Sequence, residues 1–412
     1  MAFDTIIIGG GISALACGIR LQQQGKRTAV LKSGQGTMYF FSGAFGLLSR
    51  MPDGSFVEDP FKAMENLPDT HPYSKIGTAD FRSYAMMMPS FFRECGIDVN
   101  DCSGRNGWRF LASGAVKPAW MTLDDLDLFE DRGCKPGEKA LIVNLNGFMD
   151  FFPDFIEHSL SGRGVECRKE TMVFQPAEEL RLSSNVMRTL NVSKLFDNED
   201  TLDSFISELK GLLRDEDLVI LPMFFGTKDS SPLDRIREAL PVKVMFFNTL
   251  TPSVCGIRTM GQMREAYEAL GGTLIMSPVR SAELSEGRIV SIATDSEENP
   301  VMTADNYVLA TGSFISKGLV SDSSSVKEPL LGLDVDFPES RADWYDEDST
   351  ASQNYIAAGV RTDRSFRPSI EGRTLDNLYA IGSVLSGAHS SYEGSGAGVA
   401  VLTAFKVADL LK

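Results

Sequence analysis

Several features that mark large protein classes are scarce or missing in this sequence of 412 residues. It contains no run of about 18 apolar residues, so it predicts no membrane-spanning helix. It has three histidines and six cysteines, and the cysteines form no Cys-x-x-Cys pair. These numbers and spacings disfavour a zinc site or an iron–sulfur cluster, so we expect no bound metal. The thiols are expected to stay reduced and to serve in packing.

Basic residues are also in deficit, because 40 Lys and Arg face 56 Asp and Glu for a net charge of -16. A surface this acidic repels a phosphate backbone, which argues against nucleic-acid binding. The first residues lack the basic segment of a signal peptide, since Phe3-Asp4-Thr5 leads directly into an apolar stretch. We therefore expect a cytoplasmic protein of two or three domains.

The chain opens with a pattern typical of nucleotide-binding proteins. Residues 3–8 predict a buried strand, residues 12–24 a helix and residues 27–31 a second strand. A run of three glycines separates the first strand from the helix. The alternative, a glycine turn without any ligand, stays open at this point.

The residues of this turn suit a phosphate. Gly9 permits a tight bend, Gly11 lets the backbone approach the anion, and Ala14 allows the helix to pack closely on the strand. Backbone N–H groups and the positive end of the helix dipole face the same point. We therefore expect Gly9, Gly11, Ser13 and Ala14 to bind a cofactor.

Lys32 interrupts the usual pattern at the end of the second strand. Dinucleotide-binding proteins place Asp or Glu about 20 residues after the turn, where it accepts hydrogen bonds from a ribose. Lysine has no acceptor. Lys32 could instead pair with a phosphate, or it could be a solvated residue at the strand end, and both interpretations stay open.

The last third of the chain predicts strands that return to the first sheet. Residues 307–313 predict a buried strand that ends in a small-residue turn, and residues 377–383 another that ends in glycine. A glycine-rich stretch, 387–398, precedes a closing helix. The fold class is therefore α/β, with a Rossmann-like cofactor domain built from residues 1–75 and 300–412. Residues 76–299 are expected to form an inserted α+β domain that binds substrate or a partner.

Several motifs occur in the order seen in flavoproteins of the fumarate reductase and succinate dehydrogenase type. They are Ser42-Gly43, Ala310-Thr311-Gly312, Gly359-Val360-Arg361-Thr362-Asp363 and Leu378-Tyr379-Ala380-Ile381-Gly382. Two longer strings, Pro252-Ser253-Val254-Cys255-Gly256-Ile257-Arg258 and Glu328-Pro329-Leu330-Leu331-Gly332-Leu333-Asp334-Val335, are more specific. Through them the chain resembles, nearly end to end, the B-subunit family of anaerobic glycerol-3-phosphate dehydrogenase.

The resemblance implies a flavoprotein that oxidises sn-glycerol 3-phosphate to dihydroxyacetone phosphate as one member of a complex. In that family it works with a second, catalytic flavoprotein, the A subunit, and with an iron–sulfur, membrane-anchoring protein, the C subunit. Electrons pass to the quinone pool. The resemblance thus places the chain at the cytoplasmic face of the inner membrane, through its partner.

The cofactor and the exact role stay open. The resemblance implies FMN, which Lys32 suits, with FAD as the alternative. Two rival functions remain: a noncatalytic electron-relay or scaffold role in the same complex, and a different fumarate reductase-like FAD oxidoreductase.

The candidate site residues combine both lines of reasoning. His389, beside the last glycines, is the candidate base. Arg258 and Arg361 are candidate clamps for the substrate phosphate; each could instead be an ordinary loop or ion-pair residue. The expected cofactor-binding residues are Gly9, Gly11, Ser13, Ala14, Lys32, Ser42, Gly43, Thr311, Gly312, Gly382, Ser383, Gly394, Gly396 and Gly398.

Overall fold

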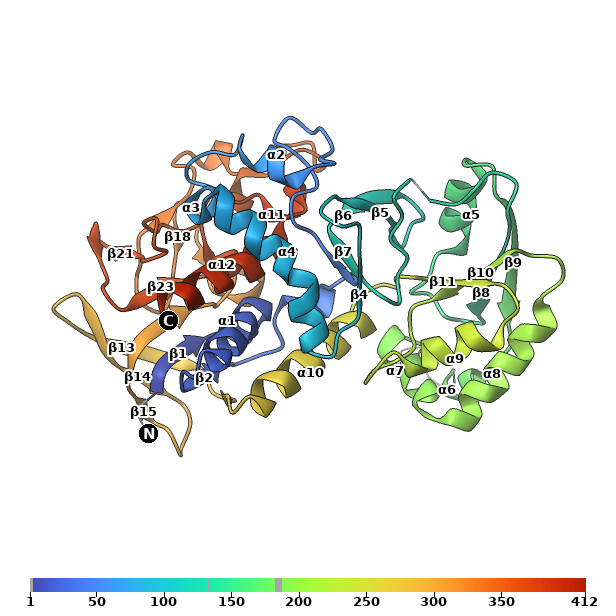
Figure 1. Cartoon of the computed structure of the whole chain (residues 1–412), viewed down its shortest axis with the longest axis horizontal. Helices are drawn as coiled ribbons and strands as arrows, with labels where there is room; N and C mark the ends of the chain where they lie inside the picture. The colour runs from blue at the N-terminus through green and yellow to red at the C-terminus, as the bar shows by residue number, and fades with distance from the viewer. Residues whose placement is uncertain (1–2, 132, 182–186) are drawn as a thin grey trace. The chain divides into compact units, whose positions relative to one another are not determined.

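The computed structural model describes residues 3–131, 133–181 and 187–412 (Figure 1). The chain forms two compact units. Unit 1 comprises Met1–Thr37, Phe45–Gly96 and Met263–Lys412, and unit 2 comprises Met38–Ala44 and Ile97–Gln262. The expected functional division into 1–75 with 300–412 and 76–299 stays a prediction, because compactness does not report which residues bind a cofactor.

A five-stranded parallel sheet forms the centre of unit 1, in the order β12-β2-β1-β16-β23. Its strands are β1 (Phe3–Ile8), β2 (Thr28–Leu31), β12 (Thr273–Ile275), β16 (Ala304–Leu309) and β23 (Leu378–Ala380). On one side of β1 the chain adds β2 and then β12, and it returns to the other side of β1 with β16. This is the strand order of a Rossmann fold, with its switch point between β1 and β16. The α/β class predicted from the sequence is confirmed.

Helices α1 (Ile12–Gln23) and α12 (Gly396–Leu410) pack against each other beside this sheet (Figure 1). Their contact faces are rich in small residues, which lets the two backbones approach closely. Helix α4 (Thr78–Glu94) packs on α12 through the rings of Phe91 and Phe405, whose centroids are 5.0 Å apart. Both ends of the chain thus contribute to one core.

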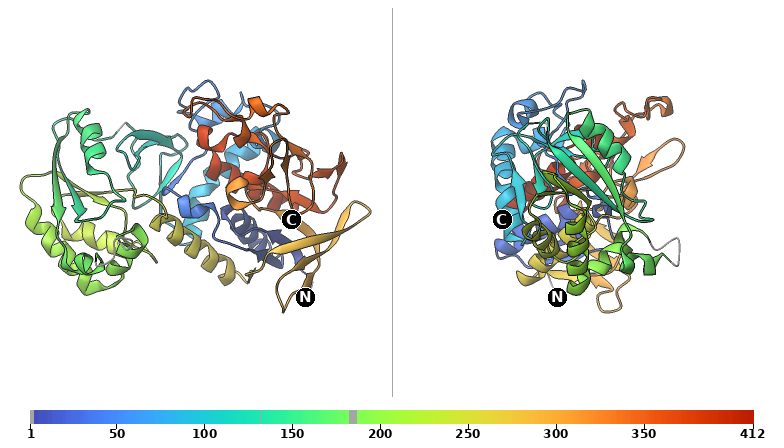
Figure 2. Two further views of the ribbon diagram at one scale, coloured as in Figure 1. Left: turned by 180° about the vertical axis from the view of Figure 1, so that it is seen from behind. Right: turned by 90° about the vertical axis from the view of Figure 1, so that its right-hand side faces the viewer.

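An antiparallel sheet of β13 (Val279–Ser285), β14 (Arg288–Thr294) and β15 (Val301–Met302) also belongs to unit 1. Glu286 and Gly287 form the turn between β13 and β14 with φ values of 49° and 77°. Figure 2 shows this hairpin projecting from the unit. The remaining elements assigned wholly to unit 1 are α2 (Pro60–Met64), α3 (Pro72–Ile76), β17 (Val320–Ser321), β18 (Val326–Lys327), β19 (Val335–Asp336), β20 (Gly359–Val360), β21 (Ser369–Ile370), β22 (Arg373–Thr374) and α11 (Ser390–Glu393).

Unit 2 contains a second parallel sheet, in the order β11-β10-β8-β9. Its strands are β8 (Lys139–Leu145), β9 (Glu166–Met172), β10 (Leu218–Pro222) and β11 (Lys243–Phe247), and the helices between them are α5 (Pro153–Ser161), α6 (Gln175–Leu180), α7 (Thr189–Ser193), α8 (Glu199–Leu212) and α9 (Ser231–Ala239). Two antiparallel pairs precede this sheet: β4 (Val99–Asp101) with β7 (Met121–Leu123), and β5 (Gly107–Phe110) with β6 (Val116–Ala119). The insertion expected to be α+β therefore combines a parallel α/β layer with antiparallel strands.

Helix α8 begins at Glu199, three residues before its first buried apolar residue, Leu202. The side chain of Asn198 accepts a hydrogen bond from the backbone N–H of Thr201 at 2.9 Å, which caps the helix. Helix α10 (Val254–Ala269) and strand β3 (Ala44–Phe45) are each shared between the two units. Within the described residues, no helix is long and apolar enough to cross a membrane.

Candidate functional site

The turn after β1 lies directly against the turn after β16. Gly9 has φ +128°, a conformation that side chains other than glycine rarely adopt, and a methyl group there would overlap the carbonyl oxygen of Ala310. The backbone N–H of Ala310 donates to the Ile8 carbonyl at 2.8 Å, and that of Gly9 donates to the Leu31 carbonyl at 2.8 Å. Glycine is therefore required at position 9 for two independent reasons.

Gly11 presents the opposite situation. It is the N-cap of α1 in an extended conformation, and no side chain caps the helix. A methyl group at Gly11 would meet no atom within 4 Å. The first N–H groups of α1 are therefore not capped by a side chain, and the helix dipole favours an anion at this end.

The C-terminal glycine segment reaches the same turn. A methyl group on Gly382, where φ is +74°, would lie 2.6 Å from the hydroxyl of Ser13, and one on Gly312 would lie 3.6 Å from the hydroxyl of Ser383. Thr311, in the turn after β16, has a buried hydroxyl without a hydrogen-bond partner in the described chain. Buried hydroxyls are normally paired, so this one indicates a missing ligand. The orphaned hydroxyl, the open helix end and the close-packed glycines together fit the phosphate and chain of a flavin.

The last three predicted glycines also have a packing role. Gly394 ends α11 with φ +63°, and a methyl group on Gly46 would overlap its carbonyl oxygen. The backbone N–H of Gly398 donates to the Gly46 carbonyl at 2.9 Å, whereas Gly396 is exposed at the start of α12. The sequence analysis missed Gly46, whose small size allows this approach. Contact of Gly394, Gly396 and Gly398 with a flavin stays a prediction.

Ser42 and Gly43 are the two expected cofactor residues that belong to unit 2. The hydroxyl of Ser42 accepts a hydrogen bond from Nη2 of Arg109 at 3.0 Å, and its carbonyl accepts one from Asn248 at 2.9 Å. Burial lowers the pKa of Arg109 to about 10. Gly43 has φ +70°, and a methyl group there would overlap the side chain of Leu126. Arg109 carries no motif that would have distinguished it in the sequence.

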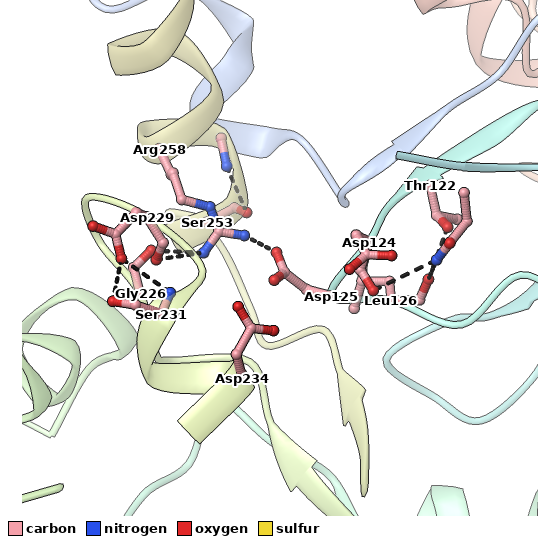
Figure 3. Close-up of polar contacts among 12 residues, drawn as sticks. Thr122, Asp124, Asp125, Leu126, Gly226, Asp229, Ser231, Asp234, Ser253 and Arg258 are labelled. Atoms are coloured by element: carbon pink, nitrogen blue, oxygen red, sulfur yellow. Dashed lines mark hydrogen bonds and ion pairs between the residues drawn. The ribbon is translucent and has the colours of Figure 1, made fainter. Parts of the chain in front are cut away.

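Arg258 is buried in unit 2, with 4 % of its surface exposed. Its guanidinium forms an ion pair with Asp125, and Nη1 donates to the carbonyls of Gly226 at 2.8 Å and Asp229 at 3.4 Å (Figure 3). Asp125 is equally buried, at 2 % exposed. The protein itself therefore holds this arginine on two sides, and a role for Arg258 as a phosphate clamp stays a prediction.

His389 and Arg361, the other two predicted catalytic residues, line one cleft of about 650 Å³ within unit 1. Lys75, Arg364 and Asp336 also line it. Three cationic side chains and one imidazole thus surround a volume large enough for a small phosphorylated substrate. The sequence analysis missed Lys75 and Arg364 because neither belongs to a pattern with a known chemical meaning.

The imidazole of His389 is positioned as a proton acceptor. Its Nδ1 is 2.7 Å from the hydroxyl of Ser352, and its Nε2 makes no hydrogen bond to any residue that the structure describes. When Nδ1 carries the proton and donates to Ser352, Nε2 keeps a free lone pair. Burial lowers the pKa of His389, although the charge of Glu393 opposes this. The ring is therefore neutral at physiological pH.

The cations of the cleft differ in how firmly the protein holds them. Arg361 is exposed and pairs through Nε with Asp336 at 2.6 Å. Lys75 donates to the carbonyl and hydroxyl of Thr362 at 3.1 and 3.0 Å, and burial lowers its pKa. Arg364 is exposed and has no ion pair or hydrogen bond from its side chain to any described residue. It is thus free to meet an anionic substrate.

A buried pair, His71 and Glu393, supports the loop that carries His389. Nδ1 of His71 accepts a hydrogen bond from the backbone of Tyr73 at 3.1 Å, so Nε2 carries the proton and faces Glu393 at 3.3 Å. Glu393 also accepts hydrogen bonds from the hydroxyl of Ser395 at 2.8 Å and the backbone of His389 at 3.1 Å. Burial opposes ionisation of Glu393, but these hydrogen bonds and the field of His71 lower its pKa overall.

All six cysteines are free thiols. No group of three or more His, Cys, Asp or Glu that could hold a metal ion occurs among the described residues.

Known proteins similar to this chain match it from end to end. A family model for the FAD binding domain matches residues 4–399. The chain is 34 % identical over 414 residues to the B subunit of anaerobic glycerol-3-phosphate dehydrogenase of Yersinia pestis bv. Antiqua (strain Antiqua), covering 99 % of this chain and 98 % of the relative. The B subunit of the same dehydrogenase of Pectobacterium atrosepticum is 33 % identical over 413 residues, with the same coverage.

Similarity to solved structures is far weaker. The 3-ketosteroid delta1-dehydrogenase from Sterolibacterium denitrificans is 11 % identical, with a TM-score of 0.43 over 100 % of this chain and 99 % of that one. L-proline dehydrogenase from P. horikoshii is 10 % identical, with a TM-score of 0.39 over 100 % and 93 %. These scores are too low to bear on function. The family model and the full-length relatives show that the chain belongs to the FAD binding domain family and, within it, to the B-subunit family of anaerobic glycerol-3-phosphate dehydrogenase.

Proposed function

We propose that this protein is a flavin-dependent subunit that oxidises sn-glycerol 3-phosphate to dihydroxyacetone phosphate. The observation that carries the proposal is the meeting of two glycine turns at the switch point of a Rossmann sheet, around Gly9, Gly11 and Thr311. It occurs in a chain that is similar over its full length to relatives named as this dehydrogenase. A bound flavin would accept the hydride from the substrate.

The turn of unit 1 would hold the cofactor. The free N–H groups of α1 beyond Gly11 would bind its phosphate, and the unpaired hydroxyl of Thr311 would gain a partner. Glycine at position 9 keeps the two turns close enough to form one cradle. FMN and FAD both fit this description.

The cleft of unit 1 would bind the substrate. Nε2 of His389 would take the proton of the substrate hydroxyl, since the ring is neutral and this nitrogen is free. The unpaired guanidinium of Arg364, together with Arg361, would attract the phosphate, because guanidinium groups match phosphate oxygens in pairs. Lys75 would add a third positive charge at the wall of the cleft.

The relatives are named as the B subunit of their dehydrogenase, which is one part of a larger complex. We extend this to the present chain and propose that it assembles with two partners. One is a catalytic flavoprotein, the A subunit, and the other is an iron–sulfur protein, the C subunit. The iron–sulfur partner would anchor the complex at the cytoplasmic face of the inner membrane and carry electrons to the quinone pool.

Two measurements on the purified chain test the proposal. The first identifies by mass the flavin released on denaturation. The second measures oxidation of glycerol 3-phosphate with a dye acceptor, for the chain alone and with its co-purified partners, using succinate as the control substrate. Bound flavin with turnover of glycerol 3-phosphate supports the proposal. Turnover of dicarboxylates alone supports a different oxidoreductase, and a flavin-free chain without turnover when its partners are active supports a scaffold role.

A further inference from the structure

A guanidinium group of unit 2 is enclosed by the protein and has no counterion among the described residues. Arg109 lies on β5, and its Nε and Nη1 are both buried without a hydrogen-bond partner in the described chain. Its side chain makes one hydrogen bond there, from Nη2 to the hydroxyl of Ser42 at 3.0 Å. Buried polar groups are normally paired, and an unpaired buried charge is costly. Arg109 therefore has donors to offer to an anion.

Arg109 also keeps its charge. Burial lowers its pKa to about 10, so the guanidinium is still protonated at pH 7. Cys255 lies in its electrostatic field, but burial raises the pKa of that thiol to about 12, and a neutral thiol is no counterion. Arg258 of the same unit differs, because its charge is balanced by Asp125 (Figure 3). Burial alone thus does not explain why Arg109 is unpaired.

The fold holds Arg109 beside the end of the parallel sheet of unit 2. The ring of Phe110, the next residue on β5, stacks on that of Phe247, the last residue of β11, with centroids 5.1 Å apart. Asn248 follows β11, and its Nδ2 donates to the Ser42 carbonyl at 2.9 Å. Ser42 is therefore bonded by both Asn248 and Arg109. Ligands of open α/β sheets bind beyond the carboxyl ends of the strands, which is where these residues meet.

Two further groups at this place favour an anion. The hydroxyl of Ser42 accepts from Arg109, and its own hydrogen bonds to no acceptor among the described residues. The first turn of α10 lies beside the same segment, because a methyl group on Gly43 would be 3.3 Å from Sγ of Cys255. The N-terminus of a helix carries a partial positive charge. One full charge, one partial charge and a hydroxyl donor thus lie together.

We propose that Arg109, Ser42 and the first turn of α10 form a second anion-binding site, in unit 2, that binds the phosphate group of a small molecule. Nε, Nη1 and the Ser42 hydroxyl are three donors, which match the three terminal oxygens of a phosphate monoester better than the two of a carboxylate. The ligand is a phosphorylated substrate or product, or free inorganic phosphate. Only the first of these sources rests on the proposed function.

Equilibrium dialysis of the full-length protein, as purified, with radiolabelled inorganic phosphate tests the site. Arg109→Met should weaken binding at one site by about 10-fold or more, the effect of losing a charge-assisted hydrogen bond. Arg109→Lys should keep part of the affinity, because it keeps the charge, and Ser42→Ala should lose less than Arg109→Met. Arg235→Met is the matched control, because Arg235 is an exposed arginine of unit 2 that pairs with Asp203, and it should bind phosphate as the wild type does.

Competition identifies the source of the phosphate group. Glycerol 3-phosphate that displaces the label at a lower concentration than unlabelled phosphate identifies a phosphorylated substrate as the ligand, and the reverse order identifies free phosphate. Glycerol should not displace the label, because it has no charge. Succinate that displaces it as well as unlabelled phosphate does would overturn the assignment to phosphate.

Thermal melting separates binding from a structural role. Without phosphate, Arg109→Met should melt at or above the wild-type temperature, because it removes a buried charge that has no counterion. Phosphate should raise the melting temperature of the wild type more than that of this variant, since a ligand stabilises the state that binds it. A melting temperature that falls equally with and without phosphate shows a structural role and overturns the inference.

A folded Arg109→Met chain that binds phosphate at as many sites and as tightly as the wild type also overturns the inference. If this variant does not fold, Arg109→Lys and Ser42→Ala decide by the same criterion. A chain that has neither flavin nor turnover, but still binds phosphate through Arg109, contradicts the proposed function and leaves this site in place.

Discussion

The buried ion pair of unit 2 yields the sharpest prediction, because it separates a structural role of Arg258 from a catalytic one. Arg258→Met leaves Asp125 buried at 2 % exposure without its counterion, and Oδ1 of that carboxylate already lacks a hydrogen-bond partner in the described chain. Removing one partner of a buried pair costs about 3–5 kcal/mol. Asp125→Leu leaves the buried Arg258 without its counterion in the same way. Each single variant should therefore lose about 4 kcal/mol of its free energy of unfolding.

The double variant carrying Arg258→Met and Asp125→Leu should recover most of that loss. Replacing a buried ion pair with apolar groups of similar size is often neutral or better, so the coupling energy should exceed about 2 kcal/mol. Urea unfolding followed by circular dichroism measures these values. In a domain of this size, a loss of 4 kcal/mol corresponds to a fall of about 8–16 °C in melting temperature.

An exposed ion pair of the same unit is the control. Arg235 is 40 % exposed and pairs with Asp203, so Arg235→Met should cost no more than about 0.5 kcal/mol. The reasoning is refuted if Arg258→Met lowers the free energy of unfolding by less than about 1 kcal/mol. If that variant also raises the KM for glycerol 3-phosphate at unchanged stability, Arg258 contacts the substrate, as the sequence predicts.

Three further predictions concern the cofactor turn and the cleft. Gly9→Ala should abolish flavin binding and lower the free energy of unfolding by about 2 kcal/mol or more. Gly11→Ala should weaken flavin binding at an unchanged melting temperature. Equal melting temperatures for the two variants would contradict the geometry. His389→Gln should lower kcat about 10²–10⁴-fold. Because the pKa of His389 is lowered, kcat/KM of the wild type should stay level at neutral pH and fall only below pH 6.5; a decline that begins above neutrality would exclude this base. Glu393→Gln should destabilise the protein by about 2 kcal/mol at pH 7. The pKa of Glu393 is lowered on folding, so the difference from wild type should shrink as the pH falls below 4.5, which stability curves at several pH values measure.

The local pattern of the sequence was sufficient for the elements that surround the cofactor turn. Apolar runs that end in glycine predict β1, β16 and β23, and each lies in the sheet where the sequence places it. Strands buried on both faces must be continuously apolar, and a tight turn beside another backbone admits only glycine. Both requirements act within a few residues of one another. The local sequence pattern is therefore sufficient to predict these strands and turns.

The tertiary structure alone determines which residues, distant in the chain, become partners. Whether Arg258 is free or paired depends on Asp125, which precedes it by more than a hundred residues and belongs to no motif. The pKa of Lys32 is likewise lowered by burial and then by the charge of Arg264, which is also distant in the chain. A charged side chain has the same local pattern whether it faces water, a carboxylate or another cation. Its energy and its function follow from the dielectric and the neighbours that only the folded chain supplies.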